Sequence, residues 1–430
     1  MRWLLAVVAI LAAGIGFGAW RTRQFIEAAP VIAAAPAIPN PVQIASAGAH
    51  FQRAPIFTAD AAKFAALSDW LATTYPRLHL VAPREAVGGL SFLYTWPGSD
   101  AALPPALFVA DANARAPLIA FFEAAESLAA GDFKPRRTIL IALTGDRAGV
   151  GGVAARLAQR NVKAWFALGP GQAMLVSHPL TGKPAALIGV AERQHLQLRV
   201  VASPPPGGEA AYALARALIA LETTPMPGGV GDEPARATAQ ALAADLPPVH
   251  AFAIANAPLL DPLIDRRTNP AWRGMLTSTL KPIGLAGGGA QTPRGPVAAF
   301  VDVGLHPLDT PEAFLARIKE ALTLYPTVTA DWQAKPAGAY RIANVNSSSY
   351  RLIAAAASRA ADGARPAPSL YDGPTASPAY GAVAEDVYSL TPVLLTPAEA
   401  AAPAPNDRLS PANLMRMIGF YRSIATLAAG

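Results

Sequence analysis

The 430-residue sequence contains no cysteine. This absence excludes disulfides, thiolate zinc sites, iron–sulfur clusters and a cysteine nucleophile, so any metal would depend on histidine and carboxylate side chains. Charged residues make up only 15% of the chain, and the 35 lysines and arginines are scattered, without a run that could follow a phosphate backbone. We therefore expect no nucleic-acid binding, although the formal net charge is +6.

Several catalytic motifs are also missing. The chain has no Gly-x-Ser-x-Gly nucleophile elbow and no His-x-Asp or His-x-x-x-His metal motif. We expect His178, His195 and His306 to be surface or hydrogen-bonded histidines and not ligands, and the serines 347–349 to lie in a loop. The sequence alone thus offers no complete set of groups for metal or serine chemistry.

Hydrophobic residues make up 52% of the chain, enough to bury the core of one large or two ordinary domains. The segment Trp3–Trp20 is uncharged, and as a helix its 18 residues would reach about 27 Å, close to the thickness of a bilayer's hydrocarbon core. This pattern predicts a signal anchor over residues 1–27. Residues 28–50, rich in alanine and proline, would form a tether, and the soluble body would be periplasmic or extracellular.

The rest of the chain alternates between helix and strand patterns. Residues 57–168 predict helices over 57–75, 118–130 and 153–160, with strands over 78–81, 90–94, 105–109, 137–143 and 162–168. Such alternation indicates an α/β fold, a mixed sheet with helices on both faces. Residues 188–334 predict a small inserted α+β domain of ferredoxin-like type. A strand over 386–395 and a helix over 411–427, capped by Ser410, should pack back on the first domain.

A glycine-rich sequence from Gly149 to Ala154 fits Gly-x-Gly-x-x-Ala between a predicted strand and helix. In a dinucleotide-binding module, this turn would hold a pyrophosphate at the helix N-terminus. The acidic residue that should follow about 20 residues later, to hold the ribose, is missing, because the next strand runs into Gly169-Pro170-Gly171. The pattern favours a structural turn and leaves dinucleotide binding as an alternative.

Four stretches of the chain form an ordered set: Leu103-Pro104-Pro105 with the strand to Val109, residues 187–192, residues 301–310 and Asp386-Val387-Tyr388. In this order they resemble the M20 family of zinc-dependent exopeptidases and amidohydrolases, in particular its carboxypeptidase S branch with the N-acyl-amino-acid hydrolases. The resemblance runs from about Phe57 to the end of the chain. It implies a peptidase-like α/β domain over 51–187 and 335–430, and a lid or dimerisation domain over 188–334.

The family holds two zinc ions with two histidines and three carboxylates, and uses a further glutamate as general base. By this resemblance, the vestigial positions here are Asp111 and Asn113 for His-x-Asp, Ala148 for the base, Gly149 and Gly169 for carboxylate ligands, and Pro403 for the last histidine. The remnants of the substrate cleft would be Gln291, Gly304, Thr375, Ser377, Asn406 and Arg408.

The altered positions predict a homologue without the metal centre, with no zinc or other cofactor, that binds or scaffolds and is catalytically inactive. The expected partners are a membrane, through the N-terminal helix, an unidentified protein or small molecule, and a second copy of the chain through the lid. Two alternatives remain: a metal-dependent hydrolase of peptides or N-acyl amino acids, with Asp111, Asn113, Asp146 or Asp407 around one weakly held ion, and the dinucleotide-binding module.

Overall fold

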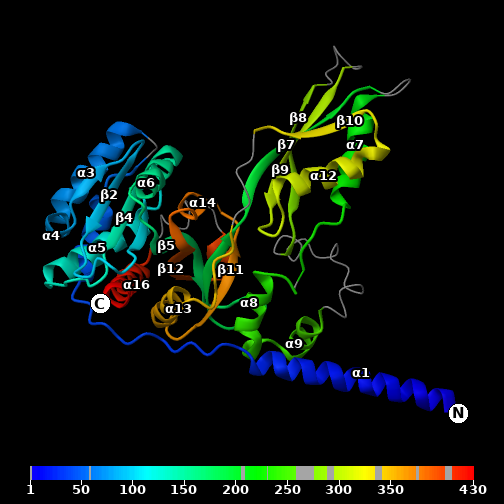
Figure 1. Ribbon diagram of the computed structural model, residues 1–430, viewed down its shortest axis with the longest axis horizontal. Coiled ribbons are helices and arrows are strands. Elements are labelled where there is room, and N and C mark those ends of the chain that lie inside the picture. The colour runs from blue at the N-terminus through cyan, green and yellow to red at the C-terminus, as the bar shows by residue number, and fades with distance from the viewer. Residues whose placement is uncertain are drawn as a thin grey trace. The chain divides into compact units, whose positions relative to one another are not determined.

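The computed structural model describes residues 2–57, 60–204, 209–229, 231–257, 276–287, 295–334, 341–373, 377–401 and 409–430, with side chains from residue 12 onward except at 377, 378 and 401. The chain divides into two compact units (Figure 1). Unit 1 comprises Met1–Val190, Ala237–Ala255 and Ala343–Gly430, and unit 2 comprises Ala191–Arg236 and Asn256–Ile342. The predicted lid range 188–334 thus includes residues 237–255, which belong to unit 1.

Unit 1 is built on an eight-stranded mixed sheet. In spatial order the strands are β1 (Arg84–Ala86), β2 (Ser91–Trp96), β4 (Ile139–Thr144), β3 (Ala106–Asp111), β5 (Ala164–Leu175), β12 (Ala384–Leu395), β6 (Ala185–Glu192) and β11 (Arg365–Tyr371). Strand β3 runs parallel to both β4 and β5, and β12 is parallel to β5. The central strands therefore end at one edge of the sheet, where ligands bind in many α/β proteins.

Helices cover both faces of this sheet, as the alternating pattern predicts. Successive side chains of a strand point to opposite faces. Leu107 of β3 packs in a buried cluster with Val153 of α6 (Arg147–Gln159), whereas its neighbour Phe108 packs on Phe121 of α5 (Arg115–Ala130), with ring centroids 5.3 Å apart. Helices α5 and α6 thus lie on opposite faces.

The C-terminal helix returns to the first domain, as expected from the sequence. Helix α16 (Pro411–Ala429) begins at the N-cap Ser410, whose side chain accepts a hydrogen bond from Asn413 N. It packs against α5, with the rings of Tyr421 and Phe121 5.4 Å apart, and against α13 (Ser348–Ala360).

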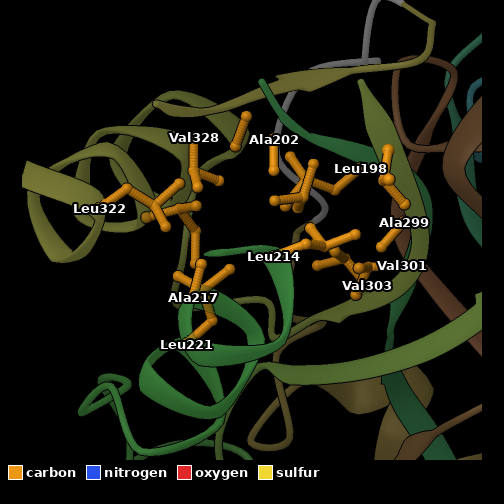
Figure 2. Packing of buried hydrophobic residues seen from close by; sticks show 14 of the residues in the cluster. Leu198, Ala202, Leu214, Ala217, Leu221, Ala299, Val301, Val303, Leu322 and Val328 are labelled. Atoms are coloured by element: carbon orange, nitrogen blue, oxygen red, sulfur yellow. The ribbon is translucent and has the colours of Figure 1, made fainter. Parts of the chain in front are cut away.

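Unit 2 has a four-stranded antiparallel sheet in the order β10-β7-β9-β8. Its strands are β7 (Gln194–Ala202), β8 (Thr279–Gly287), β9 (Val297–Leu305) and β10 (Val328–Trp332). Helices α7 (Ala210–Glu222) and α12 (Pro311–Ala321) pack on the sheet. Figure 2 shows the core between them, in which Leu214 and Leu221 of α7 meet Val301 and Val303 of β9. Unit 2 is therefore a small α+β unit, as the sequence predicts.

The N-terminal region differs from the prediction of a tether over residues 28–50. After α1 (Arg2–Glu27), residues 28–43 run in an extended path, which we call the strap, and α2 (Ile44–Arg53) follows. The strap is fixed to the body: Ala35 N donates to Ala355 O at 2.9 Å, Arg359 Nε donates to Ala35 O at 2.7 Å, and Arg422 Nε donates to Pro39 O at 2.9 Å. These hydrogen bonds attach the strap to α13 and α16, so it is not a free tether.

The predicted membrane segment Trp3–Trp20 lies partly outside the residues with described side chains. Among the residues that were open to this test, no helix combines the length and the apolar character that crossing a bilayer requires.

Two local predictions are wrong. Residues 78–81 form part of α4 (Pro76–Val81) and not a strand, because Pro76 starts the helix and the Glu126 carboxylate of α5 accepts hydrogen bonds from Arg77 N and Leu78 N. The serines 347–349 are not a loop: Ser347 is the N-cap of α13, and its Oγ accepts a hydrogen bond from Tyr350 N at 3.0 Å.

Candidate functional site

The candidate site lies at the carboxyl ends of the parallel strands in unit 1. Asp111 is the last residue of β3 and pairs with Thr144, the last residue of β4. Asp146 follows directly as the N-cap of α6. Gly169 lies in the neighbouring strand β5, whose Leu168 pairs with Phe108 of β3. The fold therefore brings these vestigial positions to one edge of the sheet.

Asp111 and Asn113 close the short connection from β3 to α5. Asp111 Oδ1 accepts hydrogen bonds from Asn113 N at 2.8 Å and from Asn113 Nδ2 at 2.9 Å. The same amide nitrogen also donates to Gly145 O at 3.2 Å. Helix α5 begins at Arg115, two residues later. The two side chains are thus engaged in holding the ends of β3 and β4 together.

Asp146 is similarly engaged. Its Oδ1 accepts hydrogen bonds from Gly149 N at 2.7 Å and Leu90 N at 3.1 Å, so it caps α6 and fastens it to the start of β2. This carboxylate sits where a dinucleotide would place its pyrophosphate. Two negative groups at one helix N-terminus repel each other, which disfavours the dinucleotide-binding alternative.

Gly149, a position where by the family resemblance a carboxylate ligand is expected, could carry a side chain only if the backbone around it shifted. A Cβ built on it would lie 2.6 Å from Leu90 O and 2.9 Å from Asp146 Oδ1. The neighbouring vestigial base position, Ala148, is exposed. At Gly169 a Cβ would meet Val109 Cβ at 3.4 Å, an ordinary contact. Of the two vestigial glycines, Gly149 is therefore the more tightly packed, at the point where α6 approaches β2.

Tyr380, the last residue of α14 (Ser377–Tyr380), fills space beside this edge of the sheet. It is fully buried with Leu107, Val153 and Ala167. Burial, and to a lesser degree the negative charge of Asp111, raise the pKa of its hydroxyl above the usual value. The hydroxyl has no hydrogen-bond partner among the residues that the structure describes. The family resemblance indicates Thr375 and Ser377, close before it in the sequence, but not Tyr380 itself.

The donors at these positions do not fit a pair of zinc ions. In the ranges that the structure covers, no three histidine, aspartate or glutamate side chains gather closely enough to hold a metal ion. Asp111 and Asp146 each use an oxygen for two backbone or amide N–H groups, and Gly149 has no room for a ligand. The remaining vestigial and cleft positions outside the described residues are Pro403, Gln291, Thr375, Asn406 and Arg408. Ser377 begins α14, and its side chain is not described.

Gly304 of unit 2 lies in β9, opposite His195 of β7 and Thr279 of β8. Arg193 Nη1 donates to Gly304 O at 3.1 Å and to Thr277 O at 2.9 Å. A Cβ on Gly304 would lie 2.6 Å from Thr279 Oγ1 and 3.2 Å from Arg193 Cδ. The side chains of Thr279 and Arg193 therefore occupy the space beside Gly304, the position at which, by the family resemblance, the lid has an arginine.

The three histidines that we expected to be non-ligands differ in burial. His178 is buried, and its Nδ1 accepts a hydrogen bond from Leu180 N at 3.3 Å, whereas His195 is exposed, with Nδ1 3.6 Å from Asp302 Oδ2. His306 is buried beside Arg193 and Asp309, and its Nδ1 accepts from Leu308 N at 3.3 Å.

His306 should make the stability of the protein depend on pH. Burial, together with the Arg193 guanidinium, lowers its pKa from 6.5 to about 4, although Asp309 acts in the opposite direction. The unfolded chain thus binds a proton near pH 6.5 that the folded chain binds only near pH 4. The free energy of unfolding is highest above pH 6.5 and should fall by up to about 3 kcal/mol as the pH drops to 4.

This expectation can be measured by urea unfolding at pH 7 and pH 4.5, in the wild type and in His306→Asn, whose amide oxygen can still accept from Leu308 N. The carboxylates titrate alike in both proteins, so the difference between them isolates His306. Equal losses of stability in the two proteins would contradict the assignment.

No family model matches the sequence. The fold, however, is that of the M20 metallopeptidases. The M20 family metallo-carboxypeptidase Sso-CP2 from Sulfolobus solfataricus aligns with a TM-score of 0.61 at 14% identity, over 90% of this chain and 99% of that one. The YXEP protein of Bacillus subtilis, a dinuclear metal binding peptidase from the M20 family, aligns with a TM-score of 0.54 at 10% identity, over 90% of this chain and 98% of that one.

Two curated proteins are similar in sequence. The N-fatty-acyl-amino acid synthase/hydrolase PM20D1 of Bos taurus is 27% identical over 57% of each chain, and that of Homo sapiens is 30% identical over 50% of this chain and 44% of its own. The chain thus spans about half the length of these relatives. Together the comparisons confirm the predicted resemblance: the chain has the M20 fold and is similar in sequence to N-fatty-acyl-amino acid synthase/hydrolases.

Proposed function

We propose that the protein is a catalytically inactive M20 homologue that binds or scaffolds other molecules in the cell envelope. The observation that carries this proposal is the contact of Gly149 with the Leu90 carbonyl, 2.6 Å from where a Cβ would lie, because it leaves no room for a ligand side chain. Hydrolysis in the family depends on metal-bound water whose pKa is lowered to about 7. The described residues contain no cluster of three anionic or imidazole side chains that could hold such an ion.

We also propose that α1 anchors the protein in a membrane, with the body on the periplasmic or extracellular side. Two features support the anchoring: the uncharged segment Trp3–Trp20 and the continuous helix Arg2–Glu27 that contains it. Basic residues lie on both sides of the segment, Arg2 before it and Arg21 and Arg23 after it, so they mark its ends but do not set its orientation. An aromatic residue followed by basic residues is typical of the end of a membrane helix.

The lid offers a surface for a second copy of the chain. Strand β8 pairs with β9 on one side and has no neighbouring strand on the other in the part of the sheet that is described, and most of its residues are exposed. Exposed edge strands can pair with an equivalent strand. We propose homodimerisation at this unit.

The competing function is a metal-dependent hydrolase of peptides or N-acyl amino acids. It is favoured by the similarity to the curated synthase/hydrolases. It would have to use Asp111, Asn113 and Asp146 beside the hydrogen bonds that Asp111 Oδ1, Asn113 Nδ2 and Asp146 Oδ1 already make, with Asp407 outside the described residues as a further donor.

Zinc content and turnover separate the two functions. The full chain, purified in detergent without chelator, is expected to contain far less than one zinc per molecule. It should release no amino acid from N-oleoyl phenylalanine, with or without added zinc, while its cooperative thermal transition shows that it is folded. Stoichiometric zinc together with chelator-sensitive hydrolysis would overturn the proposal.

A further inference from the structure

One face of α1 is packed against unit 1. Among its residues with described side chains, Gly18 is buried and Arg21, Thr22 and Phe25 are partly buried, whereas Ile15, Phe17 and Trp20 are exposed. The spacing 18, 21, 22 and 25 marks one stripe along a helix. Off this stripe, the side chains of Ile15, Phe17 and Trp20 are each more than half exposed.

Helix α1 packs against the short helices within residues 237–255, a part of unit 1 that lies between two segments of unit 2 in the sequence. Helix α1 contacts α9 (Pro248–Ala255) and the short helix η1 (Ala243–Asp245), and Gln240 Nε2 of α8 (Ala235–Leu242) donates to Phe25 O at 2.6 Å. Figure 1 shows α9 beside the end of α1 that leads into the strap. Both elements belong to unit 1.

Helix α9 is largely apolar on its outer face as well as its inner one, with His250 as the polar residue that is exposed. Ala251 and Ala255 are buried, whereas Val249 is 78% exposed and Phe252 is 36% exposed. Residues Leu246–Ala257 contain no lysine, arginine, aspartate or glutamate. A helix without a charged face is poorly suited to contact with water alone.

The location of the packed stripe within the proposed membrane helix indicates what covers the outer face of α9. Gly18 lies two residues before Trp20, about 3 Å along the helix axis, and therefore within the uncharged segment. Because the buried stripe of α1 reaches back to Gly18, the packed face of α1 extends into the last turn of the proposed anchor. Arg21 and Arg23 follow at the level where phospholipid head groups begin.

We propose that α9 is a second membrane contact, which lies in the interfacial layer of a phospholipid bilayer beside α1 with Val249 and Phe252 among the acyl chains. The inference rests on the proposed anchoring by α1. Interfacial helices bury their apolar faces about 5–10 Å into the boundary between head groups and acyl chains. The contact would hold the body close to the membrane surface.

The absence of native cysteine allows a direct test. Val249→Cys, Ala12→Cys and Leu324→Cys are each labelled with the fluorophore NBD in the full chain and reconstituted into phosphatidylcholine–phosphatidylglycerol vesicles. Leu324 is the matched control, because it is 84% exposed and belongs to unit 2. We expect the labels at 12 and 249, but not at 324, to shift to shorter emission wavelengths and to be quenched by doxyl-labelled lipid.

The outcomes separate this inference from the anchoring on which it rests. Quenching at 12 without quenching at 249 overturns the inference and leaves the anchor standing. No quenching at 12 overturns the anchor and the inference with it. As a second measurement, Phe252→Glu should reduce quenching at 249 at least threefold, because a carboxylate opposes entry into the apolar layer. The same change at Ile219 of α7, also exposed, should leave quenching at 249 unchanged.

Discussion

Gly149→Ala is expected to lower the free energy of unfolding by about 2 kcal/mol, because the added methyl group would lie 2.6 Å from Leu90 O and must push α6 away from β2. The obstacle is backbone, which cannot rotate away as a flexible side chain could. Urea unfolding of the full chain, followed by far-ultraviolet circular dichroism, measures the change.

Gly151, two residues further along the same helix, provides the matched control. A Cβ there would have no neighbour within 4 Å. Since alanine stabilises a helix interior relative to glycine, Gly151→Ala should raise stability by about 0.5–1 kcal/mol. Two substitutions of the same kind in one helix should thus have opposite signs. Equal effects would mean that α6 is not packed as described.

The second large effect is expected at Glu123, a buried carboxylate of α5. Its Oε1 contacts His50 Nδ1 of α2 at 2.5 Å and accepts a hydrogen bond from Tyr75 OH at 3.0 Å. Burial and the nearby Glu123 raise the pKa of Tyr75, so its hydroxyl stays protonated and able to donate. Glu123→Ala should therefore lower the free energy of unfolding by about 3 kcal/mol, because the tyrosine and histidine lose their buried partner.

Glu123→Gln distinguishes the carboxylate's charge from its shape. The amide can still accept from Tyr75 but offers no charge to His50, so we expect a loss of about 1 kcal/mol. Glu320→Ala, on the exposed surface of α12, should change stability by less than about 0.5 kcal/mol. These values are measured by urea unfolding at pH 7. A loss at Glu123 no larger than that at Glu320 would contradict the buried cluster.

The order of helices and strands around the central sheet was predictable from the sequence, because apolar runs such as 139–143 and periodic helices such as α5 are local signals. Helix α4 was not, because it is stabilised by the Glu126 carboxylate of α5, 48 residues from Leu78. The same limit applies to Ser347, whose hydroxyl also lies 2.8 Å from Tyr388 OH of β12. Partners this distant in the sequence are brought together only by the packing of whole helices and strands.

At the candidate site, the altered positions could be identified by the family resemblance, but what replaces the ligands could not. The lack of space at Gly149 depends on how closely α6 approaches Leu90, and the burial of Tyr380 depends on how α14 packs on α6 and β5. Asp111 and Asp146 remain acidic in the sequence. Only their hydrogen bonds show that they serve as turn and helix caps.

The strap restricts the movement of the rest of unit 1 relative to α1. If residues 28–43 were unattached, they could span about 50 Å at 3.3 Å per residue. The rest of unit 1 could then lie anywhere within that distance of the end of α1. With Ala35 and Pro39 bonded to α13 and α16, and with Gln240 fastened to the end of α1, this slack disappears. Any molecule captured by unit 1 is thereby presented at one height and one angle relative to the α1 axis.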